Sequence, residues 1–258
     1  MPKQLPSIDR ILAETFVARA EHHPTLSSTN DRAAECADCP AGELPLLVVA
    51  DRQTAGRGRG SNRWWTGPGS LAFSLLLDRL ETPAGSPLLG LAAAVAVVRA
   101  VRPLLDPRSP LGLDWPNDVM AGNKKLAGVL VEVLTNRRPV IGIGLNLNDP
   151  GAAAAEELRP RIATLRDLTD REHDRTAVLI ALLRALAAVL ETLATGPDKL
   201  AAEADRLCLQ RGRELRLRHG RETVAGRCEG IAPDGGLLLD TSNGRHRFYS
   251  GSLRDEIV

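Results

Sequence analysis

The sequence predicts an α+β fold, in which a mixed β-sheet with helices mainly on one side is followed by a small β-barrel domain. Short apolar segments with β-branched residues alternate with helical segments over the first 205 residues. From about residue 206 the pattern changes to short alternating strands separated by tight turns. The 258 residues therefore predict a larger domain, 1–205, and a smaller domain, 206–258.

Helical periodicity and capping residues predict the helices of the larger domain. Residues 7–23 carry apolar side chains at helical spacing, with Ser7 as N-cap. A second helix is expected to start at Ser86-Pro87 and to run through residue 102, because Ser is a good N-cap and Pro fits the first helical position. Asp174 caps a long helix through about residue 193, and the Ala- and Arg-rich residues 151–170 are also expected to be helical.

Short apolar runs predict the strands. In the larger domain we expect strands at 46–50, 71–77, 111–115, 126–133 and 140–147, the last two as a hairpin. Residues 51–70 between the first two strands are polar and form a long loop. In the smaller domain we expect strands at 214–218, 223–231, 237–240 and 245–249, with turns at 233–236 and 242–244.

Composition excludes several classes of protein. Hydrophobic residues make up 43% and charged residues 25% of the chain, as in ordinary globular proteins. A net charge of +1 gives no electrostatic argument for nucleic-acid binding. No run approaches the ~20 apolar residues of a membrane span, and the first residues lack the apolar core of a secretory signal. We therefore expect a cytoplasmic protein, either monomeric or homodimeric.

The four cysteines, at positions 36, 39, 208 and 228, do not predict a metal centre. Cys36 and Cys39 have the spacing of metal ligands, but no second pair of cysteines follows. A cytoplasmic location favours thiols over disulfides. The sequence therefore favours two loop thiols over a structural zinc site at Cys36 and Cys39.

The first candidate functional segment is the Gly- and Arg-rich run 51–65, which follows a predicted strand. Glycines at 56, 58 and 60 allow the backbone to approach a ligand closely. The alternating Arg57 and Arg59 provide guanidinium groups suited to phosphate or carboxylate, and Trp64 could stack on a ring. The alternative is an ordinary surface loop with a solvated basic face. The spacing matches neither a P-loop nor a dinucleotide-binding motif.

The second candidate segment is 114–132, which contains Trp115-Pro-Asn-Asp118 and Lys124-Lys125. Asn117 and Asp118 at the end of a strand could orient phosphates or hold Mg²⁺ through their oxygen atoms. Lys125 could direct a single charge at a carboxylate. The alternative is a structural hairpin in which Asn117-Asp118 and Gly122-Asn123 are turn residues.

The third candidate segment is 141–148, Ile-Gly-Ile-Gly-Leu-Asn-Leu-Asn. Glycine at alternate positions leaves one face of a strand without side chains, which could accept a flat ligand or another backbone. Asn146 and Asn148 follow on the same side of the pleat. The alternative is a crowded sheet packed on a helix. Farther upstream, Ser27-Ser-Thr-Asn30 is an ordinary N-cap signal.

Taken together and in this order, these motifs resemble the biotin protein ligase (biotin–[acetyl-CoA carboxylase] ligase) family. The resemblance spans about residues 25–258 and includes Gly230–Leu239 and Ser250–Arg254, which resemble the C-terminal SH3-like domain of that family. It implies a class II synthetase-like catalytic domain that forms biotinyl-5′-AMP from biotin and ATP. It also implies transfer of biotin to a lysine of a biotin carboxyl carrier protein. Only about 25 residues precede Ser27, so we expect a ligase without an N-terminal DNA-binding domain.

The resemblance also implies roles for individual residues. Lys125 and Arg59 would be catalytic, contacting the biotin carboxylate and the acyl phosphate. Asp118 would face Mg²⁺. The residues implied for biotin are Ser28, Thr29, Asn30, Gln53, Gly56, Arg57, Gly58, Arg59 and Lys125, and those implied for ATP are Arg57, Trp64, Asn117, Asp118 and Asn146.

One departure and two rival functions follow from the same residues. The family often has Lys or Arg where this chain has Asp114, so a cation near the nucleotide is missing and ATP affinity could differ. The first rival is a lipoate or octanoate ligase on the same scaffold. The second is a non-catalytic ligand- or nucleic-acid-binding protein that uses residues 56–63, whose binding would weaken steeply with salt.

Overall fold

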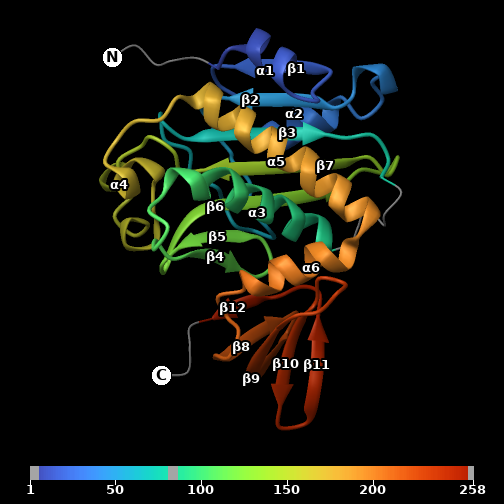
Figure 1. Cartoon of the computed structure of the whole chain (residues 1–258), viewed down its shortest axis with the longest axis vertical. Helices are drawn as coiled ribbons and strands as arrows, with labels where there is room; N and C mark the ends of the chain where they lie inside the picture. Colours follow the sequence, from blue (N-terminus) through green and yellow to red (C-terminus); the bar gives the residue numbers. More distant parts are fainter. Residues whose placement is uncertain (1–5, 81–86, 255–258) are drawn as a thin grey trace.

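The larger unit is built on a seven-stranded mixed sheet. The computed structural model describes residues 6–80 and 87–254 (Figure 1). The sheet order is β1-β2-β3-β7-β6-β5-β4, in which β1 and β2 are parallel and all other neighbours are antiparallel. The strands are β1 (Arg19–His23), β2 (Leu46–Ala50), β3 (Leu71–Leu76), β4 (Leu111–Asp114), β5 (Asp118–Ala121), β6 (Lys124–Val133) and β7 (Pro139–Leu145).

Most helices cover one face of this sheet, as predicted. α3 (Pro87–Val101) lies on β6 and packs against α5 (Arg175–Thr195), and α6 (Pro197–Arg206) packs on both (Figure 1). α1 (Ile8–Glu14) contacts α5 and β1, whereas α2 (Thr29–Glu35) covers the opposite face over β2, β3 and β7. Alternate residues of β2 are buried on the two faces, Leu47 and Val49 under the α3 layer and Leu46 and Val48 under α2.

Two helical segments, Pro87–Leu104 and Arg175–Thr195, are long and apolar enough to cross a membrane. In this fold both supply side chains to the same core as the strands, among them Val95 and Leu183, which are fully buried. α3 packs between the sheet and α5, and α5 packs on α1, α3 and α6, which accounts for the apolar composition of both segments.

The smaller unit is a five-stranded antiparallel sheet with the order β11-β10-β9-β8-β12. Gly235 and Gly244 adopt positive φ at the two predicted turns, a conformation that glycine reaches without strain. The predicted fold class is confirmed, and these antiparallel strands are consistent with the expected SH3-like domain. Its strands are β8 (Glu214–His219), β9 (Glu222–Ile231), β10 (Leu237–Thr241), β11 (Gly244–Phe248) and β12 (Ser252–Arg254).

The predicted helix over residues 7–23 is wrong in its second half. Ser7 caps α1 as expected, but the helix ends at Glu14 because Thr15 is extended and its hydroxyl donates to the carbonyl of Ile11. Residues 19–23 form β1, which pairs with β2. Pairing with a strand distant in sequence overrides the local helical periodicity.

The helix predicted over residues 151–170 is also wrong for most of its length. The segment forms 3-10 turns at Gly151–Ala153 and Arg159–Arg161, and only α4 (Leu165–Thr169), capped by Thr164, is α-helical. Between the second 3-10 turn and α4, Ala163 donates its N–H to the carbonyl of Lys125. The backbone here is therefore bonded to the sheet and does not form a helix. α6 was not predicted. The predicted N-cap Ser86 lies outside the described residues, and the boundary at 205/206 remains a prediction.

The segment that follows α6 joins the two units. It pairs with the edge strand β4, because Leu113 donates to the carbonyl of Leu207 at 2.8 Å and accepts from Leu209 at 3.0 Å. The indole N–H of Trp115, which is almost fully buried, reaches into the smaller unit and donates to the carbonyl of Gly235 at 3.0 Å. The end of β4 is therefore fixed from both sides.

The carboxylate of Asp114, at the end of β4, lies in surroundings that disfavour its charged form. Burial raises its pKa to about 6, and repulsion by Asp118, its cross-strand neighbour, adds to the effect. Attraction by Lys125 and Arg213 opposes the shift. The side chain of Gln210 donates a hydrogen bond to Asp114. Above pH 6 the folded protein therefore holds a negative charge that would be better solvated in the unfolded chain.

This arrangement predicts how stability depends on pH. An unfolded Asp has a pKa of ~3.9, so the folded state binds the proton of Asp114 more tightly, and its contribution to stability is lost as pH rises from about 4 to 6. Asp114→Asn removes the charge and keeps an acceptor for Gln210. In urea unfolding we expect the variant to match wild type near pH 4 and to be more stable by about 2–3 kcal/mol at pH 7. Asp38→Asn, at an exposed position, is the control. A stability difference between Asp114→Asn and wild type that does not change with pH would contradict this account.

Candidate active site

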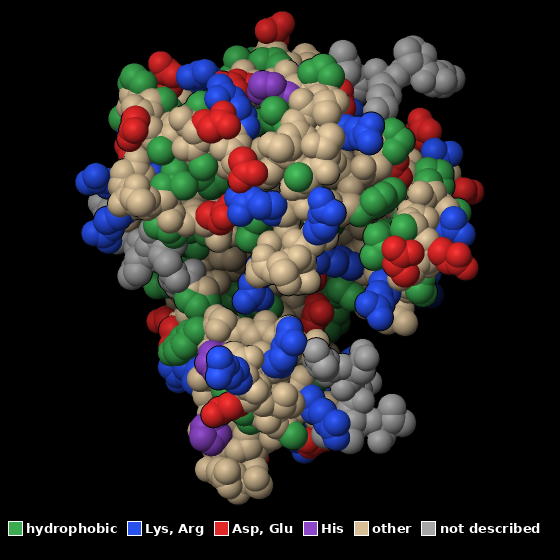
Figure 2. Space-filling model, turned by 180° about the vertical axis from the view of Figure 1, so that it is seen from behind, with side chains coloured by type: hydrophobic (Ala, Val, Ile, Leu, Met, Phe, Trp, Pro, Cys, Tyr) green, Lys and Arg blue, Asp and Glu red, His purple; other side chains and the backbone are tan. Residues whose placement is uncertain are grey.

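The residues singled out in the sequence converge on one cavity of about 500 Å³. The cavity lies on the face of the sheet opposite α3 and α5. Successive residues of β7 alternate between the two faces, so Gly142 and Gly144 face the cavity while the side chains of Ile141 and Ile143 lie in the core. On this face of the molecule, Lys and Arg side chains lie above and below the junction of the two units (Figure 2). The predicted residues among its lining are Ser28, Thr29, Asn30, Gln53, Arg57, Gly58, Arg59, Trp64, Asn117, Asp118 and Lys125.

Two predicted residues lie just outside this lining. Gly56 is packed so closely against the carbonyl of Trp64 that a Cβ atom would lie 2.7 Å from it. Asn146 is buried and donates from its side-chain amide to the carbonyl of Lys125 at 3.0 Å. Both residues therefore shape the site from behind, Gly56 by closing the loop and Asn146 by holding the backbone of Lys125.

Glycines of β6 and β7 form the floor of the cavity. A Cβ atom on Gly144 would collide with the indole of Trp64, and one on Gly142 would collide with the amide of Asn30. A Cβ atom on Gly128 would lie 3.0 Å from the same indole. The bare face expected from the Gly-x-Gly pattern is therefore present, and in this structure side chains of the chain itself occupy it.

A hydrogen-bonded network of polar side chains closes one end of the cavity. Gln53 accepts from the N–H of Thr29 at 2.8 Å and donates to Thr66 at 3.4 Å. The fully buried hydroxyl of Ser74 lies 2.7 Å from the hydroxyl of Thr29 and 2.6 Å from Oδ1 of Asn30. Ser28 caps α2 and thereby sets the start of this helix, as predicted. Such a connected set of donors and acceptors suits a polar, uncharged ligand group.

The guanidinium of Arg57 is paired with carboxylates of the protein itself. Its guanidinium donates two hydrogen bonds to Glu132, at 2.8 and 2.6 Å, and lies 2.7 Å from Asp31. Asn30 donates to the same carboxylate at 2.7 Å. Burial raises the pKa of Glu132, but the hydrogen bonds from Arg57 and Asn30 outweigh it and lower that pKa overall. Arg57 therefore fastens the loop to β6 and α2.

Lys125, on β6, lines the cavity with its side chain. Its ammonium group is 2.5 Å from Oδ2 of Asp118 and 5.5 Å from the centroid of the Trp64 ring. The hairpin alternative also holds, because β4, β5 and β6 form a meander with Asn117 in the first turn and Gly122 at positive φ in the second. The meander itself brings Asp118 and Lys125 together.

Arg59 connects the loop to both units. Its guanidinium donates to Oδ1 of Asn117 at 3.4 Å and to the carbonyl of Gly251 in the smaller unit at 3.5 Å. Burial lowers the pKa of Arg59, opposed by the charge of Asp118. The smaller unit also lines the cavity with Arg218 and Ser252, which are opposite each other in the β8–β12 register.

Two buried polar atoms of the site have no hydrogen-bond partner: Oδ1 of Asp118 and Nε1 of Trp64. A buried polar atom without a partner costs roughly 1–3 kcal/mol, so a ligand that pairs with it recovers this energy. The residues that the structure describes contain no group of three or more His, Cys, Asp or Glu side chains arranged to hold a metal, in the cavity or elsewhere. Cys36 and Cys39 lie at the end of α2 as free thiols.

Three residues of the site lie outside the roles predicted from the sequence. Ser74 is the only polar residue of the strand Leu71–Leu76, a signal that could have been used. Glu132 ends the candidate segment 114–132 but carries no predicted role, because its partner Arg57 is 75 positions away. Arg218 reaches the cavity only because the smaller unit folds back against the larger one, which no local pattern reveals.

Comparisons with known proteins agree with this geometry. Residues 23–148 match the biotin/lipoate A/B protein ligase family, and residues 212–252 match the biotin protein ligase C-terminal domain. The chain is 34% identical over 240 residues to the bifunctional ligase/repressor BirA of Bacillus subtilis, covering 90% of this chain and 72% of that protein. It is 35% identical over 213 residues to the biotin–[acetyl-CoA-carboxylase] ligase of Mycobacterium tuberculosis, covering 81% and 77%.

A solved structure is similar over nearly its whole length. The biotin protein ligase from Aquifex aeolicus, in complex with biotin and ATP, has a TM-score of 0.80 and 30% identity. The similarity covers 92% of this chain and 99% of that one. The cavity motifs, both matched domains and these relatives lead to one assignment: the chain belongs to the biotin protein ligase family.

Proposed function

We propose that this chain activates biotin with ATP to form biotinyl-5′-AMP and pyrophosphate. It then transfers the biotinyl group to the lysine of a biotin carboxyl carrier protein, with release of AMP. The observation that carries the proposal is the arrangement of one cavity, which has a polar network at one end and Lys125 and Arg59 at the other. Its volume of about 500 Å³ suits small-molecule ligands.

The polar network would bind the ureido ring of biotin. Thr29, Asn30 and Gln53 offer both donors and acceptors, and Ser28 and the loop residues Arg57 and Gly58 lie around the same end. A ureido group carries two N–H donors and one carbonyl acceptor, so it needs such a mixed set. Ser74 and Glu132 fix the orientations of these side chains.

Lys125 and Arg59 would bind the reacting groups. The carboxylate of biotin attacks the α-phosphate of ATP, so two anions must be brought together, and negative charge accumulates on the phosphoryl oxygens. Lys125 can exchange its contact with Asp118 for the biotin carboxylate, and Arg59 can hold the mixed anhydride. Trp64 would pack on adenine, and Asn117 would face the phosphates, with Asn146 holding Lys125 from behind. Closure of the loop over the anhydride would exclude water.

Asp118 would hold Mg²⁺ in this proposal. Its Oδ1 atom is buried and unpaired, and carboxylate oxygen is a ligand that Mg²⁺ prefers. The ion would offset the negative charge of the phosphates. The neighbouring Asp114 stands where the family often has a cation, so we propose that the metal also reduces the repulsion between these two carboxylates.

One comparison leaves the acyl substrate open and the other favours biotin. The family matched by residues 23–148 includes both biotin and lipoate ligases, whereas the domain matched by residues 212–252 is named for biotin protein ligases. We therefore expect ATP-dependent addition of biotin to the acceptor lysine of a carrier domain, measured by intact mass. Addition of lipoate or octanoate instead would be compatible with the fold but would contradict biotin as the substrate.

Lys125 provides a specific test. Lys125→Ala should reduce formation of biotinyl-5′-AMP at least ~100-fold, because the carboxylate and phosphate would lose the charge that brings them together. The adenylate can be quantified by mass spectrometry after quenching. Lys124→Ala removes the adjacent lysine, which is exposed and outside the cavity, and should leave the rate unchanged. Equal rates for wild type and Lys125→Ala would exclude the assigned role.

The loop arginine provides a test of retention. Arg59→Gly should let the adenylate leave the cavity, because the contacts to Asn117 and Gly251 that tie the loop across it would be lost. In a mixture of carrier and serum albumin, we expect biotin on both proteins with this variant and on the carrier alone with wild type. Arg52→Gly changes an exposed arginine of the same loop outside the cavity and should label only the carrier. Labelling by Arg59→Gly confined to the carrier would count against retention by the loop.

A further inference from the structure

We propose that Arg175 is a positioning residue that fixes both ends of the loop 51–70 and thereby sets where Arg59 and Trp64 lie over the cavity. The proposal rests on the proposed function for its activity readout. Arg175 is the first residue of α5 and lies on no motif that sequence analysis singled out. Among the described residues it is one of the most deeply buried arginines, with only 5% of its side chain exposed.

Its guanidinium contacts the two ends of the loop. Nη1 donates to Oδ1 of Asp51, directly after β2, at 2.8 Å, and Nη2 donates to the carbonyl of Ser70, directly before β3, at 3.3 Å. The side chain of Asp51 is 9% exposed, so the ion pair is almost fully buried. The planar guanidinium can hold both acceptors at once, which a lysine cannot do in the same geometry.

The second end of the loop is held by a further carboxylate. Asp149 accepts from the N–H of Gly69 at 2.6 Å and from the hydroxyl of Ser70 at 2.8 Å. A Cβ atom on Gly67 would lie 2.5 Å from Asp149, so the backbone packs directly on this side chain. The first end is held by backbone hydrogen bonds, in which Asp51 donates to the carbonyl of His23 at 3.0 Å and Leu26 donates to the carbonyl of Arg52 at 3.0 Å. The carboxylate of Asp51 is contacted by Arg175 and approached by His22, whose Nε2 lies 3.2 Å away without forming a hydrogen bond.

Internal hydrogen bonds transmit the position of the ends to the site. Trp64 donates its N–H to the carbonyl of Gly56 at 2.9 Å, and Gly58 donates to the carbonyl of Asn62 at 2.8 Å. The loop is therefore a folded flap and not a flexible tether. A shift at its base would move Arg59 and Trp64 with it, and displacement of catalytic groups by about 1 Å can reduce a rate ~100-fold.

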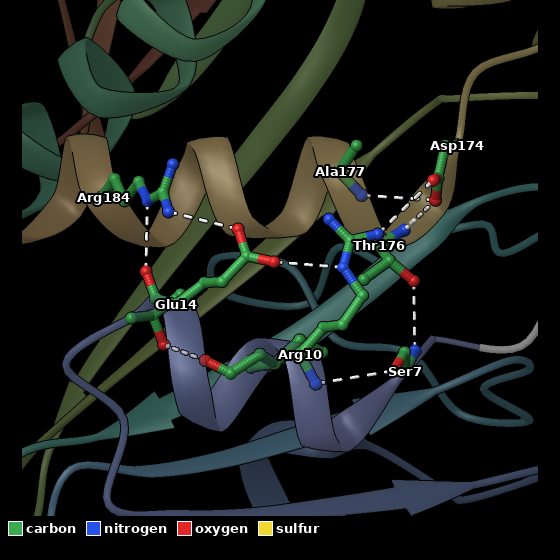
Figure 3. A network of polar contacts seen from close by, with 9 residues as sticks. Ser7, Arg10, Glu14, Asp174, Thr176, Ala177 and Arg184 are labelled. Atoms are coloured by element: carbon green, nitrogen blue, oxygen red, sulfur yellow. Dashed lines mark hydrogen bonds and ion pairs between the residues drawn. The ribbon is translucent and has the colours of Figure 1, made fainter.

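The start of α5 is itself held in place by the N-terminal helix. The N–H of Ser7 donates to Oγ1 of Thr176 at 3.0 Å, and Arg10 lies 3.9 Å from Asp174, the N-cap of α5 (Figure 3). About two turns farther along α5, Arg184 and Glu14 form an ion pair at 3.2 Å (Figure 3). Arg175 therefore projects from a fixed helix end onto the base of the loop.

Stability alone does not account for this ion pair. Nε of Arg175 is buried without a hydrogen-bond partner, which is unfavourable. Well-packed apolar residues commonly replace a buried ion pair with no loss of stability, whereas loss of one partner leaves an uncompensated charge. Through Arg175 the ion pair connects the two ends of the loop, which an apolar pair would not do.

The test therefore changes both partners. Arg175→Met with Asp51→Leu removes the pair without leaving a buried charge, and Arg175→Lys keeps the charge with one contact. We expect the folded double variant to form biotinyl-5′-AMP with kcat reduced at least 10-fold and KM values within about 3-fold of wild type. Arg175→Lys should restore part of kcat. The control, Arg99→Met with Glu203→Leu, removes the half-buried ion pair between α3 and α6 and should leave kcat unchanged.

A second readout does not depend on the reaction. Trypsin cleaves after arginine, so the double variant should be cut at Arg57, Arg59 or Arg63 at least 10-fold faster than wild type under native conditions, while the control variant should not. A folded double variant with wild-type kcat and wild-type cleavage would overturn the proposal. If the wild-type chain forms no adenylate, the proposed function fails, and the cleavage rates then decide whether Arg175 positions the loop.

Discussion

The site depends on three positions where the sheet can carry no side chain. At Gly128, Gly142 and Gly144 a single added carbon would meet Trp64 or Asn30. Because these glycines carry no side chain, the loop 51–70 and the start of α2 pack directly on the backbone of β6 and β7. Any larger residue there would lift Trp64 or Asn30 from the floor and separate the polar end of the cavity from its cationic end.

The charges above this floor are paired with one another in the free protein. Lys125 is held by Asp118, and Arg57 by Glu132 and Asp31, so the cavity contains strong cations that are already compensated. Anionic substrates must exchange partners with these carboxylates, which limits binding of any single anion. Arg59 differs from Lys125 and Arg57, because it is desolvated and its hydrogen bonds go to neutral oxygen atoms. A bound phosphate would give its charge a partner.

Local sequence predicted what local physics determines. Strand β2, helix α5 with its cap Asp174, and the turns at Gly235 and Gly244 follow from periodicity and from the conformations that particular residues allow. The ordered motifs predicted most of the cavity lining. What failed depends on contacts distant in sequence: β1 is a strand because β2 pairs with it, and Ile162 is extended because it lies along Lys125. Arg175 and Arg218 act through such contacts, so no local pattern indicates them, whereas Ser74 stands out only as the polar residue of an apolar strand.

The central claim is that this cavity brings the carboxylate of biotin to the α-phosphate of ATP. Its most direct test is exchange of labelled pyrophosphate into ATP by the purified chain, without any carrier protein. The account predicts exchange that requires biotin and a divalent cation and that is not supported by lipoate or octanoate. Absence of exchange from folded protein with Mg²⁺, at saturating biotin and ATP, would contradict it.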